Sequence, residues 1–285
     1  MTNYIRTTGG LLIPESEIDV DLPYETGLDP ASEEEDTSEH YAASGIFQEF
    51  PSSWIIPRSK WKEELENAKR LKTLADHWCM RMTNQAPTHE CVTHATMQAF
   101  ESCGNLSYGM AGKFPFVSPL SIYLICNPGV RGGTTLSRAL KVAHEIGFLP
   151  DRHGPDGPLS QVGKWTVTLH TTAGNDSQDG GPWVAERNLP AGHADVRKNF
   201  RVLSAFNIRT VEQAVSAVTR GFAVVYARKG HCIPGTEFDF RNNDLLWGYR
   251  DSYRVKRWDS EPTLRRALGS AFAIASVTKP MGLAA

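Results

Sequence analysis

Cys91 stands at the start of an apolar helical pattern and follows a loop that contains Pro87. The N-terminal end of a helix stabilises negative charge, so it favours thiolate over thiol and makes a cysteine nucleophilic. Gln85, six residues earlier, is placed to present its side-chain amide, beside the Cys91 backbone N–H, to a developing oxyanion. The pattern indicates nucleophilic attack on a carbonyl. The structural alternative is a buried cysteine that begins a core helix.

Two histidines flank this cysteine and come near the HExxH zinc motif. His89 and His94 are five residues apart rather than four, which on a helix turns the second imidazole by ~140° from the first. The two rings then point apart, and no remote cluster of ligands completes a set of His89, Cys91 and His94. We therefore expect no metal and no other cofactor.

Further segments carry recognisable patterns in a fixed order along the chain. They are Ser118–Tyr123, the Gly-Gly segment from Gly132 and Gly133 to Leu140, the segment Glu212–Tyr226, the dipeptide Gly230-His231, and the segment Asp251–Trp258. Together with Gln85 and Cys91, they resemble the papain family of cysteine peptidases over about residues 46–280. The resemblance implies a two-lobed fold with a long central helix.

The resemblance also implies roles for individual residues. Cys91 would attack the scissile carbonyl, and His231 would accept its proton and later return one to the leaving amine. Asp251, at a position where the family has asparagine, would orient the imidazole. Asn243 and Asp244 are alternatives for this third role because they lie closer to His231 along the chain. Gln85 would complete the oxyanion hole, and the glycines 132 and 133 would let the substrate backbone lie close.

Some residues depart from the family pattern. Glu90 and Val92 flank Cys91 where the family has a small residue and an aromatic, and a carboxylate beside a thiol opposes its ionisation. Tyr253 and Arg254 replace the family's Trp and Gly.

The sequence predicts one of two functions. The first is a papain-like cysteine peptidase acting on peptide or isopeptide bonds, and the second is a weak or inactive papain fold serving as a structural component of a virion or other large assembly. A phage-associated branch of the family fits the Ser-Pro and Gly-Gly segments.

The elements that must position these residues are helical in the first half of the chain and strand-rich in the second, which predicts an α+β fold. A composition rich in Gly, Pro, Asp and Ser predicts a long loop region over 150–192. We expect helices at 60–78, 90–103, 118–123, 135–147 and 210–219, and strands at 164–169, 222–227, 249–258 and 271–277. Gly104 and Asn105 are expected to end the second helix.

The predicted domain organisation is an acidic N-terminal arm over 1–45 and a papain-like domain over 46–285. The domain divides into a helical lobe at 46–149, the loop-rich segment at 150–192, and a strand-rich, antiparallel and barrel-like lobe at 193–285. The net charge of −2 hides an asymmetry, since residues 1–50 carry −11 and the remainder +9. The arm is therefore expected to dock on its own body or on an assembly partner. Candidate basic partners are Arg58, Lys60, Lys62, Arg250, Arg254, Lys256 and Arg257.

Composition excludes several classes of protein. A chain of 285 residues with 40% hydrophobic residues is not mostly disordered, and its near-zero net charge does not indicate a nucleic-acid partner. No apolar stretch is long enough for a membrane helix, and the first residues lack the pattern of a secretory leader. Five cysteines without metal or disulfide spacing suggest reduced thiols, which favours the cytoplasm or a virion. The expected partner is a peptide or protein substrate.

Overall fold

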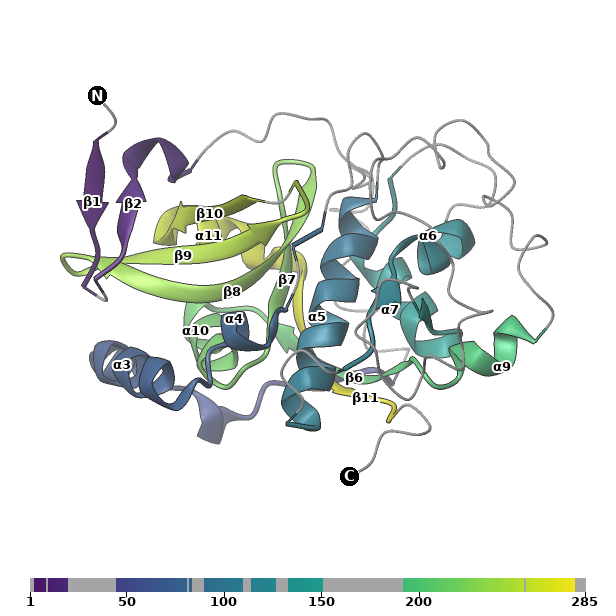
Figure 1. Cartoon of the computed structure of the whole chain (residues 1–285). Helices are drawn as coiled ribbons and strands as arrows, with labels where there is room; N and C mark the ends of the chain where they lie inside the picture. Colours follow the sequence, from purple (N-terminus) through teal and green to yellow (C-terminus); the bar gives the residue numbers. More distant parts are fainter. Residues whose placement is uncertain are drawn as a thin grey trace.

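The computed structural model has a helical half and a sheet half, packed against each other (Figure 1). Among the residues it describes, no helix is long and apolar enough to cross a membrane. The mixture of helices and one large sheet confirms the predicted α+β class. The described residues are 3–8, 10–19, 45–80, 82–83, 90–109, 114–126, 133–150, 192–253 and 255–279.

A seven-stranded sheet dominates the second half of the chain. Neighbouring strands are antiparallel except at one edge, where β3 runs parallel to β6. The sheet is therefore mixed rather than purely antiparallel, with β10 and β3 at its two ends. In sheet order the strands are β10 (Val255–Ser260), β9 (Asp244–Asp251), β8 (His231–Arg241), β7 (Val224–Arg228), β11 (Ala271–Val277), β6 (Val202–Ile208) and β3 (Phe47–Glu49).

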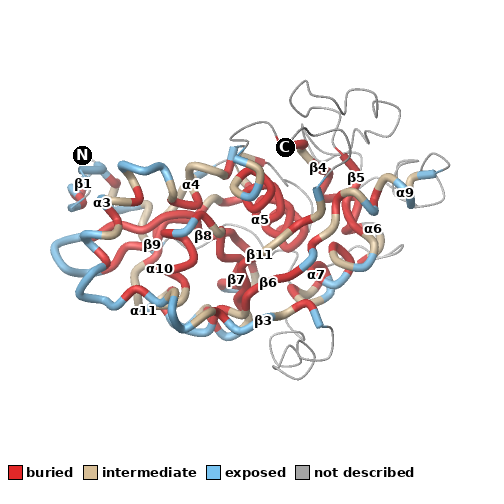
Figure 2. The backbone as a smooth tube through the Cα atoms, turned by 90° about the horizontal axis from the view of Figure 1, so that it is seen from below, coloured by how far each residue is buried: buried red, intermediate tan, exposed pale blue. Residues whose placement is uncertain are grey.

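The central helix α5 (Cys91–Ser107) packs against β8 and β11, and its residues from Cys91 to Asn105 are all buried (Figure 2). A helix buried on every side belongs to the interior rather than to a surface layer. It packs against α6 (Leu120–Cys126) and α7 (Leu136–Glu145), whereas α9 (His193–Arg197) lies farther out and contacts β5 (Leu149–Pro150). The helices predicted at 118–123 and 135–147 are confirmed by α6 and α7. Thr135 caps α7 by accepting a hydrogen bond from the backbone N–H of Arg138.

The prediction that Gly104 and Asn105 end the central helix is wrong. A Cβ atom on Gly104 would lie 2.4 Å from the ring of buried Phe114, so the glycine admits this ring instead of ending the helix. Asn105 donates to the Trp78 carbonyl oxygen and accepts from the Phe114 backbone N–H, both at 3.1 Å. The identities of Gly104 and Asn105 are therefore explained by the side chains and backbone that pack on the helix at these positions.

The single helix predicted at 60–78 is two helices, α3 (Trp61–Leu71) and α4 (Ala75–Trp78). Lys72 takes a left-handed conformation at φ 57°, and Thr73 N–H donates to the Ala68 carbonyl oxygen at 2.9 Å. This pair ends α3 in the way glycine usually ends a helix, although no glycine is present. The chain can then turn so that α4 lies against the sheet.

The second half contains more elements than expected. The helix predicted at 210–219 is α10 (Val211–Thr219), and the strand at 271–277 is β11. The strand predicted at 249–258 is instead a hairpin of β9 and β10, and the one at 222–227 is β7. The sequence analysis missed β6, β8 and α11 (Glu261–Ala267). The segment 151–191, including the strand predicted at 164–169, lies outside the described residues.

The first residues form a small hairpin on the sheet half (Figure 1). It consists of β1 (Tyr4–Arg6) and β2 (Leu12–Pro14), followed by the 3-10 turn η1 (Glu15–Glu17). Ile5 and Ile13 pack on Leu246 and Trp258. Thr8 N–H donates to the Phe240 carbonyl oxygen at 2.8 Å, near the opposite end of β8 from His231.

The described part of the arm, residues 3–8 and 10–19, therefore docks mainly through apolar packing. Its described ion pair joins Glu15 to Arg241 at 3.0 Å, a partner that the sequence analysis did not name. Of the seven basic residues proposed as partners, Arg254 lies outside the described residues. The other six, Arg58, Lys60, Lys62, Arg250, Lys256 and Arg257, all pair with groups of the body at 45–279. The domain boundaries at 45, 149 and 192 stay predictions.

Candidate active site

Cys91 is the first residue of α5 and is fully buried. The residue before it, Glu90, has left the helical conformation at φ −104° and ψ 16°, and its carbonyl oxygen accepts the first helical hydrogen bond from His94 N–H at 2.9 Å. The thiol therefore sits where the backbone N–H groups of the first helical turn create positive potential.

His231 and Asp251 meet because β8 begins where its antiparallel neighbour β9 ends. The Nε2 atom of His231 lies 3.0 Å from Oδ1 of Asp251, and both side chains are completely buried. The same carboxylate oxygen accepts a hydrogen bond from the backbone N–H of Tyr253 at 3.3 Å. The Tyr253 ring stacks on the imidazole, with ring centroids 5.7 Å apart and planes 24° from parallel. The imidazole is thus held at one nitrogen and covered on one face.

The Cys91 thiol is near enough to this imidazole to affect its protonation. Burial lowers the pKa of His231, but hydrogen bonds with Asp251 and Cys91, together with the charges of both groups, raise it to about 9. Nε2 faces Asp251, so Nδ1 is the ring nitrogen left for the thiol. Within the described part of the chain, Nδ1 has no hydrogen-bond partner. The structure therefore brings three of the predicted site residues together.

The two alternatives for the third residue lie elsewhere. Asn243 and Asp244 are exposed at the turn between β8 and β9, the end of this hairpin remote from His231. Asn243 Oδ1 accepts a hydrogen bond from Lys62 Nζ at 2.8 Å. Asp251 is therefore the carboxylate that contacts the imidazole.

Two of the other predicted site residues, Gln85 and Gly132, lie outside the described residues. Gly133 is half-buried and stands two residues before the start of α7's capping turn at Thr135. Described contacts do anchor the chain that leads to Gln85. Thr83 accepts a hydrogen bond from the Gln98 side chain on α5 at 3.1 Å.

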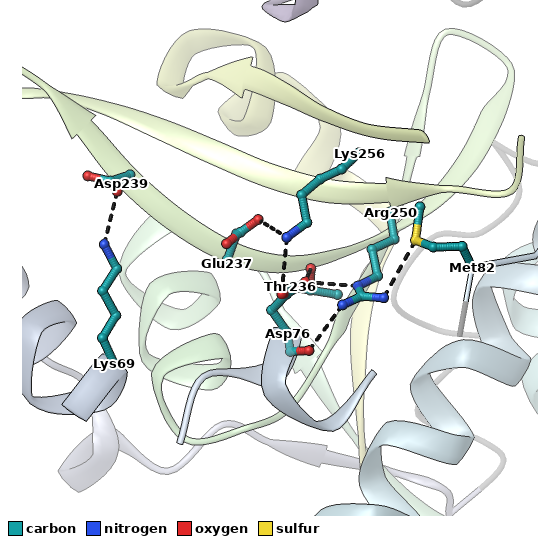
Figure 3. A network of polar contacts seen from close by, with 8 residues as sticks. All are labelled: Lys69, Asp76, Met82, Thr236, Glu237, Asp239, Arg250 and Lys256. Atoms are coloured by element: carbon teal, nitrogen blue, oxygen red, sulfur yellow. Dashed lines mark hydrogen bonds and ion pairs between the residues drawn. The ribbon is translucent and has the colours of Figure 1, made fainter. Parts of the chain in front are cut away.

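A network of ion pairs next to the site was missed by the sequence analysis (Figure 3). Asp76 of α4 binds Arg250 Nε at 2.8 Å and Lys256 Nζ at 3.0 Å, and Lys256 also binds Glu237 at 2.6 Å. Burial raises the pKa of Asp76, but the hydrogen bond and charge of Arg250 outweigh it, so the pKa lies below its usual value. Burial and the charge of Asp76 raise the pKa of Glu237.

This network fastens α4 to the hairpin that carries Asp251. Arg250 immediately precedes Asp251 and points to the opposite face of the sheet, where its Nη1 also lies 3.5 Å from Met82 Sδ. Arg250 and Lys256 are directly opposite each other in the β9·β10 register. Their side chains share one face of the hairpin, an arrangement that shows only once the strand pairing is known.

The carboxylate of Glu90, a concern because it neighbours the nucleophile in sequence, lies near a buried histidine. Glu90 Oε2 is 3.7 Å from His94 Nε2, one helical turn along α5, and both side chains are buried. Among the described residues, no group of three or more His, Cys, Asp or Glu side chains is arranged to hold a metal ion. His89 lies outside that part of the chain.

All five cysteines lie in the described residues, are buried and are unpaired with one another. Burial raises the pKa of Cys79 and Cys126 to about 11 and that of Cys103 to about 12. Burial and the charge of Cys91 raise the pKa of Cys232 well above its usual value. Four of the five thiols are therefore held in the protonated, unreactive form at neutral pH.

Solved structures share this fold, although sequence comparison alone does not reveal it. No family model matches the chain, and no curated protein is similar to it in sequence. The chain nevertheless has the fold of the papain-like cysteine proteases. Digestive procathepsin L 3 of the Tenebrio molitor larval midgut is similar with a TM-score of 0.54 and 10% identity, covering 82% of this chain and 74% of that one.

A second solved structure agrees. The clostridial cysteine protease Cwp84 after propeptide cleavage has a TM-score of 0.52 and 12% identity, and the match covers 75% of this chain and 58% of that one. At these identities the likeness concerns the fold, so the chemistry of this chain must be argued from its own residues.

Proposed function

We propose that this chain is a papain-like cysteine peptidase or a closely related hydrolase, acting on peptide or isopeptide bonds. Cys91 is the nucleophile, His231 carries the proton, and Asp251 orients the imidazole. The observation that supports this most is the environment of His231, which a buried carboxylate holds at one ring nitrogen and whose pKa is raised in part by the Cys91 thiol at the head of α5.

The proposed reaction has two stages. The Cys91 sulfur attacks the carbonyl carbon with its proton already on His231, whose pKa is raised to about 9, and the carbonyl oxygen becomes negative. The Cys91 backbone N–H and the predicted Gln85 amide stabilise that oxygen. The C–N bond then breaks, and protonated His231 gives its proton to the leaving amine. Water hydrolyses the thioester in the second stage, with His231 accepting the water proton, and the thiol is regenerated.

Mapping of thiol reactivity tests this proposal. Native protein is treated with iodoacetamide or with an epoxide of the E-64 type, and the modified cysteines are identified by mass spectrometry. We expect Cys91 to react faster than the other four, because those thiols are held protonated by burial. His231→Ala is expected to slow the Cys91 reaction by about 100-fold. Cys126→Ala, which removes a buried thiol remote from the imidazole, serves as the control and keeps the Cys91 rate.

Equal and slow reaction of all five thiols would contradict the peptidase. That outcome would leave the second sequence-based prediction, an inactive papain fold acting as a structural component of a virion or other assembly. Reactive Cys91 would also support a reducing compartment as the working environment, because an unpaired catalytic thiol must stay reduced. Hydrolysis of a peptide library by wild type and not by Cys91→Ala would then define the substrate class.

A further inference from the structure

We propose that Arg257 is a positioning residue of this site, which neutralises and holds Asp251 so that a carboxylate can occupy the place of the family's neutral asparagine. The inference rests on the proposed function for its catalytic meaning. Its physical content, the effect of Arg257 on the Asp251–His231 pair, does not depend on turnover.

The register of the β9·β10 hairpin builds this contact. Asp251 is opposite Val255, and Arg257 is opposite Tyr249, so Asp251 and Arg257 are diagonal neighbours on the same face. The Nε atom of Arg257 lies 3.4 Å from Oδ2 of Asp251. Oδ1 of the same carboxylate faces His231, so the carboxylate has the imidazole on one side and the guanidinium on the other.

Because Asp251 and His231 are buried, an unbalanced charge in this pair would cost free energy. The Asp251 side chain is completely buried, and that of Arg257 is 19% exposed. An aspartate in the place of a neutral asparagine adds one negative charge to this buried pair, and the guanidinium of Arg257 balances it. A buried unpaired charge is strongly unfavourable, so the substitution of asparagine by aspartate calls for a cation at this position.

The charged and titratable groups around His231 come from several elements of the described structure. Cys91 lies on α5, Asp251 ends β9, and Tyr253 stacks from the turn that follows. Arg257 on β10 acts through Asp251. The neighbouring strand β7 places Arg228 opposite His231 in register, and its guanidinium pairs with Asp259 at 3.0 Å. Arg257 is thus a cation whose ion-pair partner is the carboxylate that contacts the imidazole.

The test measures the titration of the His231 imidazole by NMR on full-length protein with labelled histidine. Arg257→Gln is expected to raise the pKa of His231 by about one unit, because the carboxylate then acts on the imidazole without a competing cation. Asp251→Asn is expected to lower it by more than one unit. The double variant Asp251→Asn/Arg257→Gln should lie between Asp251→Asn and wild type, with a higher urea midpoint than Asp251→Asn alone, since it no longer contains an unpaired buried guanidinium.

Two further variants complete the design. Arg257→Lys keeps the charge and should leave the pKa of His231 within about half a unit of wild type. Arg209→Gln removes an arginine that pairs with exposed Glu49 at 3.5 Å and should change nothing. The proposal is overturned if Arg257→Gln titrates like Arg209→Gln, or if the double variant is no better than Asp251→Asn. Slow alkylation of Cys91 in wild type would sink the proposed peptidase instead, and the NMR result would still decide the role of Arg257.

Discussion

The proton on His231 sets the working pH of the proposed site. Because Asp251 and Cys91 raise its pKa to about 9, the imidazole is protonated at neutral pH and loses its proton above that value. The protonated form is the one that donates to the leaving amine. Activity that depends on this proton is therefore present below pH 9 and is lost as the pH rises through 9.

We expect the alkaline limb of peptide hydrolysis, or of Cys91 alkylation by anionic iodoacetate, to have its midpoint near pH 9. Asp251→Asn should move this midpoint to lower pH, because one of the two groups that raise the pKa is removed. The check is a rate profile from pH 5 to 10.5, with a neutral reagent, iodoacetamide, as the matched control for reagent charge. A limb that stays at the same pH in Asp251→Asn would contradict this assignment.

A second single-residue prediction concerns Tyr253, whose stacked ring is expected to shield the His231 imidazole from water. Tyr253→Phe keeps the stacked ring and should leave the Cys91 alkylation rate within about 2-fold of wild type. Tyr253→Ala removes the ring and should slow alkylation by about 10-fold, because water then competes for the His231–Asp251 hydrogen bond. Equal rates for the alanine and phenylalanine variants would show that the stacking has no such effect.

Candidate site residues could be predicted from the sequence where neighbouring residues along the chain indicate their role. Cys91 was found from its place at the head of a helix, and His231 and Asp251 from family-like segments. The pairing of Arg257 with Asp251 was not, and the sequence analysis named Arg257 only as a candidate partner for the acidic arm. Its true partner depends on how β9 and β10 pair, which nothing within either strand specifies.

Among the elements, α5 is buried from Cys91 to Asn105 and leaves no room for a side chain at Gly104. Gly104→Ala would improve helix propensity, but its Cβ would meet the Phe114 ring at 2.4 Å. We expect it to lower the free energy of unfolding by about 1–3 kcal/mol, the usual cost of overpacking. Gly269→Ala, whose Cβ would meet nothing within 4 Å, is the control and should stay within about 0.5 kcal/mol of wild type. Chemical denaturation measures both, and equal effects would contradict the packing argument.

The network around Asp76 leads to a prediction for α4. Asp76→Ala leaves Arg250 and Lys256 without their shared carboxylate in a largely buried place. We expect a loss of about 2–4 kcal/mol of unfolding free energy, because Arg250 loses its carboxylate and Lys256 keeps only Glu237. Glu63→Ala, which removes an exposed partner of Lys60, should cost less than about 1 kcal/mol. Urea unfolding of the two variants compares them, and a similar small loss in both would show that the network contributes little.

Strands were harder to predict than helices for a physical reason. In β8, every residue from His231 to Phe240 is buried, so both faces of the strand contact protein and the apolar–polar alternation disappears. The strand also contains Pro234 and Gly235, which usually mark turns. Gly235 stands where the Trp247 side chain crosses β8, since a Cβ there would lie 2.3 Å from the indole.

At the scale of the whole molecule, the N-terminal hairpin contributes to the stability of the fold but lies far from the proposed active site. Deletion of residues 1–19 would expose Leu246 and Trp258 and should lower the unfolding free energy. It should leave the rate of Cys91 alkylation unchanged, because the hairpin docks at Phe240, roughly 30 Å along β8 from His231. Ile13→Asp, which disrupts the same packing without shortening the chain, should behave alike. Faster alkylation in either variant would contradict this separation and show that the hairpin affects access to the thiol.

The β9·β10 hairpin carries different polar partners on its two faces. One face presents Asp251 and Arg257 to the imidazole, and the other presents Arg250 and Lys256 to Asp76. A slip of one residue in the pairing would exchange the faces and bring a guanidinium to the imidazole in place of the carboxylate. Misregistered molecules would therefore place cations beside the imidazole on one face and Asp251 beside Asp76 on the other. The strand pairing that lets Arg250 and Lys256 meet Asp76 is the same one that brings Asp251 to His231.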